Sequence, residues 1–284
     1  MIDEVDVVFK QVEGLLRNAN SKAISDTARI SARLLNWFSS LDAADEVYSL
    51  SDKQKSSHLE IAVKLHNKAR NLVAVPLTEV RTLLKATSAW MLTLYGGEKA
   101  KTYVAAIKIL SKCGQEFSSL HPTIAQQCFL STIDNWKKAT SKSIQLDASP
   151  LELEDLKTAV FWSYVEVVRC RSCLHADDYE HTRKHISEAI EIMQTLPSRL
   201  KFTLAEEVMT VAYRITEQES QLLLMDESTY YFKTVLHIID SAMLPDSNVE
   251  GNASSSTSSI VKIDMLKVKI NAQLALSFIY MEQR

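Results

Sequence analysis

The chain has 284 residues, a net charge of −3, and only five Gly and five Pro. Such a length can bury a large core without disulfides or metals. The shortage of Gly and Pro counts against a fold rich in tight turns and favours helices joined by short polar loops. No stretch is strongly basic, so nucleic-acid binding through phosphate contacts has no support from composition.

The cysteines indicate a reducing compartment, because four are too few for a disulfide framework: Cys113, Cys128, Cys170 and Cys173. The first ten residues are acidic, whereas a signal peptide begins with basic residues. No apolar run approaches the roughly 20 residues that cross a bilayer. We therefore expect a soluble intracellular protein.

Apolar residues recur at helical spacing along almost the whole chain, beginning with Ile2, Val5, Phe9, Val12 and Leu16. The pattern predicts helices over residues 2–16, 24–38, 57–72, 76–95, 98–117, 122–140, 150–174, 178–196, 199–223 and 227–243, and a last helix from about residue 260. Pro76 suits the first turn of its helix, and Gly96 and Gly97 end that helix. Pro150 opens another helix, whose first turn carries acidic residues that complement the helix dipole.

The predicted fold class is all-α, namely one continuous α-solenoid of degenerate tetratricopeptide-like hairpins over residues 1–284. Within this single domain, residues 1–97 form N-terminal helices and residues 98–244 hold the clearest repeats. The polar, Ser-rich stretch 245–259 is expected to be a disordered loop. Residues 260–284 are expected to form the first helix of a further repeat.

The repeat assignment depends on a pattern of small and bulky residues that lets paired helices pack closely. A tetratricopeptide second helix has a Tyr near its start, then a small residue, a bulky one, another small one and a Pro. Here these are Tyr179, Thr182, Ile186, Ala189 and Pro197. The small-to-bulky step recurs at Ala125 and Phe129 and at Ser228 and Phe232, while Leu276, Ser277 and Tyr280 match a first helix. The core is expected to include Leu65, Leu84, Trp90, Phe129, Trp136, Tyr164, Ile186, Ala189 and Phe232.

Cys170, Cys173, His181 and His185 raise the question of a zinc site, because a hairpin near Asp177 would bring them to similar heights. Against zinc, the gap from Cys to His is short and the Cys pair lies inside a helix. Cysteine is also a common small buried residue. We therefore expect no stoichiometric zinc and no other cofactor. The haem-attachment pattern also fails, since Leu174 separates Cys173 from His175.

No Gly-rich phosphate loop or hydrolase motif occurs, and we expect a non-enzymatic protein. Lys64, Asn67, Lys68 and Asn71 could form a carboxylate clamp on one helix, but polar contacts between helices explain them more simply. Asn252 fits a glycosylation pattern that an intracellular chain would not use. The serines at 254–256, 258 and 259 are plausible phosphorylation targets. Catalytic, metal and cofactor residues are therefore predicted to be absent, and the binding residues stay open.

Four stretches resemble one family, the meiotic tetratricopeptide-repeat proteins related to sporulation-specific protein 22 and testis-expressed protein 11. "KLHNKARNL" (64–72) is similar to an early family helix, with Leu65 and Asn67 retained and His66 where the family has Trp. "VRTLLKATSAWML" (80–92) is similar to the next helix with its early Arg. "HPTIAQQCFLSTIDNW" (121–136) and the region 161–240 are similar to its first clear repeats.

The resemblance covers residues 59–284 and implies a nuclear, chromosome-associated scaffold that promotes meiotic crossovers and synapsis. It implies protein partners from the crossover-promoting group and no catalytic residues. We expect neither direct nucleic-acid binding nor membrane contact. The alternative is a general intracellular adaptor, or a co-chaperone-like module, that binds acidic C-terminal peptides through Lys64, Asn67, Lys68 and Asn71.

The last predicted helix carries apolar residues on more than one stripe: Met265, Val268, Leu274, Leu276, Phe278 and Tyr280. The terminal repeat of a solenoid needs a polar outer face, and this helix does not offer one. We therefore expect that the chain is a piece of a longer solenoid or that another chain covers this helix.

Overall fold

The computed structural model describes residues 10, 21–38, 50–72, 77–96, 99–141, 148–173, 179–218, 222–243 and 255–282. Helices account for nearly all of these residues, and none of those described lies in a β-strand. The predicted all-α class is therefore confirmed. The predicted helix over residues 2–16 lies outside the described residues.

The chain divides into two compact units, Met1–His175 and Ala176–Arg284. The first unit contains α2 (Ser21–Phe38), α4 (Asp52–Arg70), α5 (Thr78–Tyr95), α6 (Ala100–Phe117), α7 (Pro122–Ser141) and α8 (Pro150–Cys173). The second contains α9 (Tyr179–Gln194), α10 (Ser198–Gln218), α11 (Leu222–Met243) and α12 (Ser255–Glu282).

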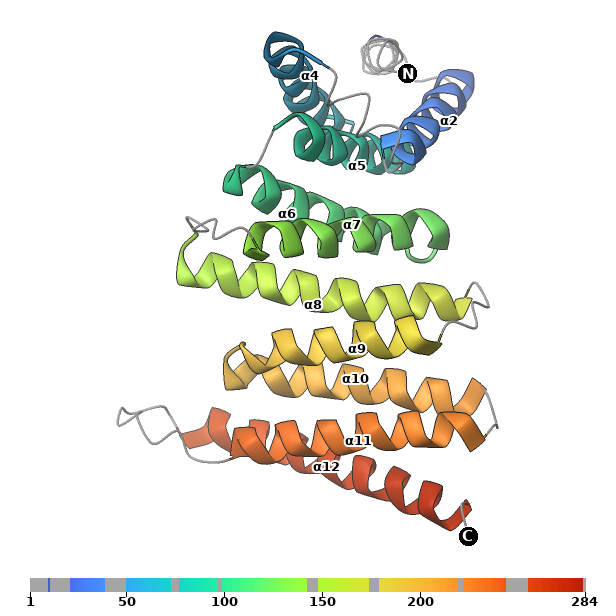
Figure 1. Ribbon diagram of the computed structural model, residues 1–284, viewed down its shortest axis with the longest axis vertical. Helices are drawn as coiled ribbons and strands as arrows, with labels where there is room; N and C mark the ends of the chain where they lie inside the picture. The colour runs from blue at the N-terminus through green and yellow to red at the C-terminus, as the bar shows by residue number, and fades with distance from the viewer. Residues whose placement is uncertain are drawn as a thin grey trace. The chain divides into compact units, whose positions relative to one another are not determined.

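Each unit is built by packing consecutive helices side by side (Figure 1). In the first unit α4, α5, α6, α7 and α8 contact one another in chain order, α2 contacts α5, and α6 also reaches α8. In the second unit α10 contacts α9 and α11, while α12 contacts both α11 and α10. Contacts to the next helix and to the one after it are typical of solenoid-like helical repeats.

The predicted core is largely confirmed. Seven of the nine expected residues are fully or almost fully buried: Leu65, Leu84, Phe129, Tyr164, Ile186, Ala189 and Phe232. Trp90 and Trp136 are only partly buried, which is usual for the largest side chain. The apolar pattern of residues 178–196 predicts an inward stripe of Thr182, Ile186, Ala189, Ile190 and Met193. All of these are buried in α9 except Thr182, which is partly buried.

Three helices begin about five residues before their predicted starts: α4 and α12 extend into polar sequence, and α11 begins at Leu222, not at residue 227. α4 begins at Asp52, not near residue 57, because Ser51 and Gln54 form a capping box. The Gln54 amide donates to Ser51 Oγ at 3.4 Å, and the Ser51 amide donates to Gln54 Oε1 at 3.0 Å. α12 begins at Ser255, so the predicted Ser-rich loop is wrong over 255–259, since a helix packed along its later turns can extend into polar residues. Residues 245–254 lie outside the description.

The contact between α6 and α7 shows why small residues recur in this chain. A Cβ atom placed on Gly114 of α6 would lie 2.5 Å from Phe129 Cε1 of α7. Both residues are buried, and Phe129 has no exposed surface. The ring therefore lies directly against the α6 backbone, and only glycine permits this approach.

We expect Gly114→Ala to destabilise the first unit, although alanine in a helix is usually about 1 kcal/mol better than glycine. Forcing a methyl group into a packed contact costs about 1 to 3 kcal/mol. The clash with the Phe129 ring should outweigh the propensity gain and lower the stability by up to about 2 kcal/mol. Chemical denaturation followed by circular dichroism measures this loss.

The double variant Gly114→Ala, Phe129→Leu tests the cause, because a smaller side chain leaves room for the methyl group. If the clash is responsible, adding Gly114→Ala to the Phe129→Leu background should cost clearly less than adding it to the unmodified chain. An equal cost in both backgrounds would contradict this explanation.

Candidate peptide-binding groove

A groove of about 380 Å³ lies in the first unit between the N-terminal halves of α6 and α8. This volume falls within the range of small-ligand sites. Partly buried Val104 and Ala105 supply apolar surface, whereas Lys101 and Lys108 are exposed along α6. Ala100 from α6 and Glu152 from α8 complete the lining.

Helical spacing brings the α6 residues onto one face. Lys101, Val104, Ala105 and Lys108 are three or four residues apart, so their side chains project from the same side of the helix. On the opposite wall, Ser149 Oγ accepts a hydrogen bond from the Glu152 amide at 3.2 Å. This contact caps the start of α8 and fixes Glu152 in its first turn.

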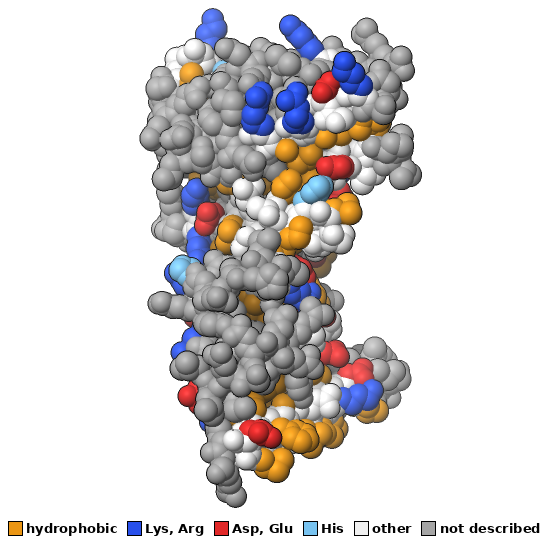
Figure 2. All heavy atoms as spheres, turned by 90° about the vertical axis from the view of Figure 1, so that its right-hand side faces the viewer, with side chains coloured by type: hydrophobic (Ala, Val, Ile, Leu, Met, Phe, Trp, Pro, Cys, Tyr) orange, Lys and Arg blue, Asp and Glu red, His pale blue; other side chains and the backbone are white. Residues whose placement is uncertain are grey.

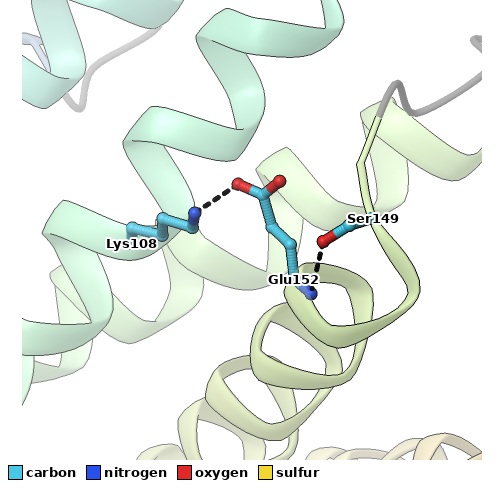
Figure 3. Close-up of polar contacts among 3 residues, drawn as sticks. All are labelled: Lys108, Ser149 and Glu152. Carbon is cyan, nitrogen blue, oxygen red and sulfur yellow. Dashed lines mark hydrogen bonds and ion pairs between the residues drawn. The ribbon is translucent and has the colours of Figure 1, made fainter.

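Lys108 and Glu152 close one side of the groove with an ion pair between the two helices (Figure 3). Lys108 Nζ lies 2.5 Å from Glu152 Oε1, and both side chains are more than one-third exposed. The hydrogen bond from Lys108, together with its charge, lowers the pKa of Glu152 below its ordinary value. Glu152 is therefore ionised at neutral pH and keeps Lys108 oriented across the groove.

Lys101 gives the groove a cation that is not already paired. Among the described residues it forms no hydrogen bond or ion pair, in contrast to Lys108. Lys101 also lies in the first turn of α6, an end that no side chain caps and where the helix dipole favours anions. Two lysines and one glutamate leave a formal charge of +1, so the lining suits a carboxylate beside a small apolar group.

The clamp considered from sequence lies elsewhere, along the exposed side of α4. Lys64, Asn67 and Asn71 are exposed there, and their spacing of three and four residues places them on one side of the helix. Lys64 Nζ is paired with Glu60 at 2.6 Å, and Asn71 is the C-terminal cap of α4. Lys64 and Asn71 therefore already have structural roles within their own helix, and Lys68 also has an interaction partner.

The residues considered for zinc are placed only in part. Cys170 is buried in α8, and the side chain of Cys173 lies outside the described part of the structure. His185 is buried in α9, with Nδ1 2.6 Å from the carbonyl oxygen of His181. No group of three or more His, Cys, Asp or Glu within the described residues could hold a metal ion. Asn252 and Ser254 are not described, and the other serines begin α12.

The stretch 64–72, quoted above for its resemblance, covers the last turns of α4 and the two residues after it. Leu65 is buried, whereas Asn67 is exposed. His66, at the position where the family has Trp, is half-buried, and its Nδ1 lies 3.4 Å from Ser88 Oγ of α5. Burial lowers the pKa of His66, and the charges of Lys85 and Arg70 lower it further. The ring is therefore neutral at neutral pH where it adjoins Ser88 of α5.

Sequence reasoning missed the groove because its walls lie far apart in the chain. Lys108 and Glu152 are separated by 44 positions, and nothing in either helix indicates that they meet. Two weak sequence signals pointed to the groove. Lys101 and Lys108 are spaced to lie on one face of α6, and the first turn of α8 is acidic.

We expect Lys108→Met to raise the pKa of Glu152 toward its ordinary value, because the hydrogen bond and the positive charge that lower it are lost. Carboxyl-carbon NMR titration of the full chain measures this change. Lys101→Met is the matched control, since it removes a groove lysine that is not paired with Glu152. A similar pKa rise in both variants, or none in Lys108→Met, would show that the ion pair is not the cause.

Comparisons with known proteins identify no family. No protein-family model matches the chain, and no curated protein matches it. A solved chain described as "Computational Design of Self-Assembling Cyclic Protein Homooligomers" has 13% sequence identity and a TM-score of 0.22, covering 99% of this chain and 97% of its own. A TM-score this low supports no conclusion about fold or assembly. None of the described helices is long and apolar enough to span a membrane.

Proposed function

We propose that this chain is a non-enzymatic scaffold that binds other proteins, and that the groove between α6 and α8 holds a short acidic segment of a partner. The observation that carries the proposal is the unpaired Lys101 at the start of α6, beside the apolar surface of Val104 and Ala105. A carboxylate at Lys101 and an adjacent small apolar side chain would use both features.

Binding in this groove should be modest in strength. The lysines are exposed, and exposed ion pairs contribute about 0 to 1 kcal/mol each. Apolar burial against Val104 and Ala105 must supply the rest, so we expect a Kd of about 10 to 100 μM for a short peptide. The Lys108–Glu152 pair adds selectivity, because Glu152 repels a second carboxylate at that end of the groove.

The sequence resemblance supports a more specific setting for this scaffold. The stretches 64–72, 80–92 and 121–136, together with region 161–240, are similar to the meiotic tetratricopeptide-repeat family. On that basis we propose a nuclear, chromosome-associated role in crossover formation and synapsis, with partners from the crossover-promoting group. The alternative is a general intracellular adaptor, and it is favoured by the groove itself, because carboxylate binding requires no meiotic partner.

A titration of the full chain with a fluorescein-labelled peptide tests the groove. The peptide should contain an Asp or Glu next to Val or Ala, and fluorescence anisotropy reports its binding. Lys101→Glu should weaken binding at least tenfold, because it replaces the unpaired cation with a repelling charge. A peptide with Asn or Gln in place of the acidic residue should bind up to about fivefold more weakly, because it loses the ion pair without adding repulsion.

Lys53→Glu is the matched control, because Lys53 is an exposed lysine on α4, away from the groove. It makes the same change in net charge and should leave peptide affinity within about twofold. Equal losses in Lys53→Glu and Lys101→Glu would mean that only net charge matters, and the groove proposal would fail.

The meiotic setting requires an experiment of its own. Capture of partners from meiotic cells, identified by mass spectrometry, should recover crossover-promoting proteins with the unmodified chain. Capture with Lys101→Glu should recover fewer of them if the groove is their site. Equal recovery of unrelated partners from non-meiotic cells would favour the general adaptor instead.

A further inference from the structure

α12 has large apolar side chains on two opposite faces. One face packs against α10 and α11 and is buried, through Met265, Val268, Ala272, Ala275, Leu276 and Ile279. The other face is exposed and consists of Ile263, Leu266, Ile270, Leu274, Phe278 and Met281. We call these six exposed residues the outer stripe. Hydrophobic side chains are visible near the lower edge of the view in Figure 2.

The outer stripe has the same order of spacings from either end: three, four, four, four and three residues. These spacings keep all six side chains on one side of a helix. A pattern that reads identically in both directions is self-complementary when two copies of the helix lie antiparallel. Ile263 then lies opposite Met281, Leu266 opposite Phe278, and Ile270 opposite Leu274.

We propose that two copies of this chain associate through an antiparallel pair of α12 helices, with the two-fold axis near residue 272. Every large side chain of the outer stripe then meets a large apolar side chain of the other copy. Such an interface is isologous, because the same patch is used on both subunits. The proposal does not depend on the α6–α8 groove, which lies in the other unit.

The exposed apolar area is large enough for such a dimer. The six side chains are 49% to 64% exposed, which corresponds to about 100 Å² each for side chains of this size. The outer stripe therefore offers about 600 Å² per copy, or about 1,200 Å² in a dimer, which reaches the lower end of specific protein interfaces. The largest patch on a monomer is typically about 300 to 600 Å².

The charges beside the outer stripe do not oppose association of identical copies. Lys267 Nζ lies 3.0 Å from Asp264 Oδ1, and Lys269 Nζ lies 2.6 Å from Asp240 Oδ1 of α11. In the antiparallel register Lys267 lies opposite Ser277 of the other copy, and the two copies of Lys267 are about 15 Å apart along the axis, so their charges do not meet. Exposed, uncharged Gln273 supplies a polar rim position, and exposed Ser277 leaves room opposite Lys267.

The test is the mass of the full chain in solution, measured by sedimentation velocity from about 1 to 100 μM. We expect a reversible dimer, and Ile270→Asp should weaken it at least tenfold, because each copy would bury an unpaired carboxylate at the centre of the interface. Leu151→Asp is the matched control: Leu151 is 64% exposed but lies on α8, so its dimer should match that of the unmodified chain. Circular dichroism confirms that both variants are folded.

Cross-linking tests the antiparallel register. A mixture of Leu266→Cys and Phe278→Cys chains, treated with a short bismaleimide, should give a linked heterodimer. Leu266→Cys alone should give little product above the unmodified chain, since its two cysteines would be about 18 Å apart along the axis. A monomer at 100 μM, a dimer unaffected by Ile270→Asp, or efficient linking of Leu266→Cys to itself would overturn the proposal.

Discussion

The close approach of neighbouring helices is the constraint on which this architecture depends. Phe129 lies against the α6 backbone at Gly114, and buried small residues such as Ala125 and Ser228 share the helices that carry Phe129 and Phe232. One face of α6 packs against α7. The face that carries Lys101, Val104 and Lys108 therefore lies beside the start of α8. The groove is therefore a consequence of helix packing.

Helix faces could be predicted from the sequence, because apolar spacing directly reports which side of a helix is buried. Leu65, Phe129 and Ile186 illustrate this success. The start of α4 was harder to predict, because a capping box of Ser51 and Gln54 lies ahead of the apolar pattern.

The groove could not be predicted, because the contact between Lys108 and Glu152 depends on how α6 packs on α8. The two-faced character of α12 was visible in the sequence, but separating its buried face from its exposed one required its contacts with α10 and α11.

The two proposed surfaces differ in chemistry and lie in different units of the chain. The groove is small and charged, and it suits a weak contact with a short segment. The outer stripe of α12 is larger and apolar, and it suits association of two copies. A dimer formed through α12 would carry two grooves, so a partner with two acidic segments would bind more tightly than either segment alone. A scaffold of this kind gains affinity from repetition without a deep binding site.

The packing of each helix on its near neighbours also shapes how the chain folds. Most contacts in such an arrangement join residues that are close in sequence, which favours rapid folding. Each helix is then stabilised by its contacts with the neighbouring helices. A helix that has neighbours on several sides should undergo local unfolding least often. α6 contacts α5, α7 and α8, whereas the main contacts of α9 within its unit are with α10. Among the described helices, backbone amides should therefore exchange hydrogen slowest in α6 and its neighbours, and faster in α9.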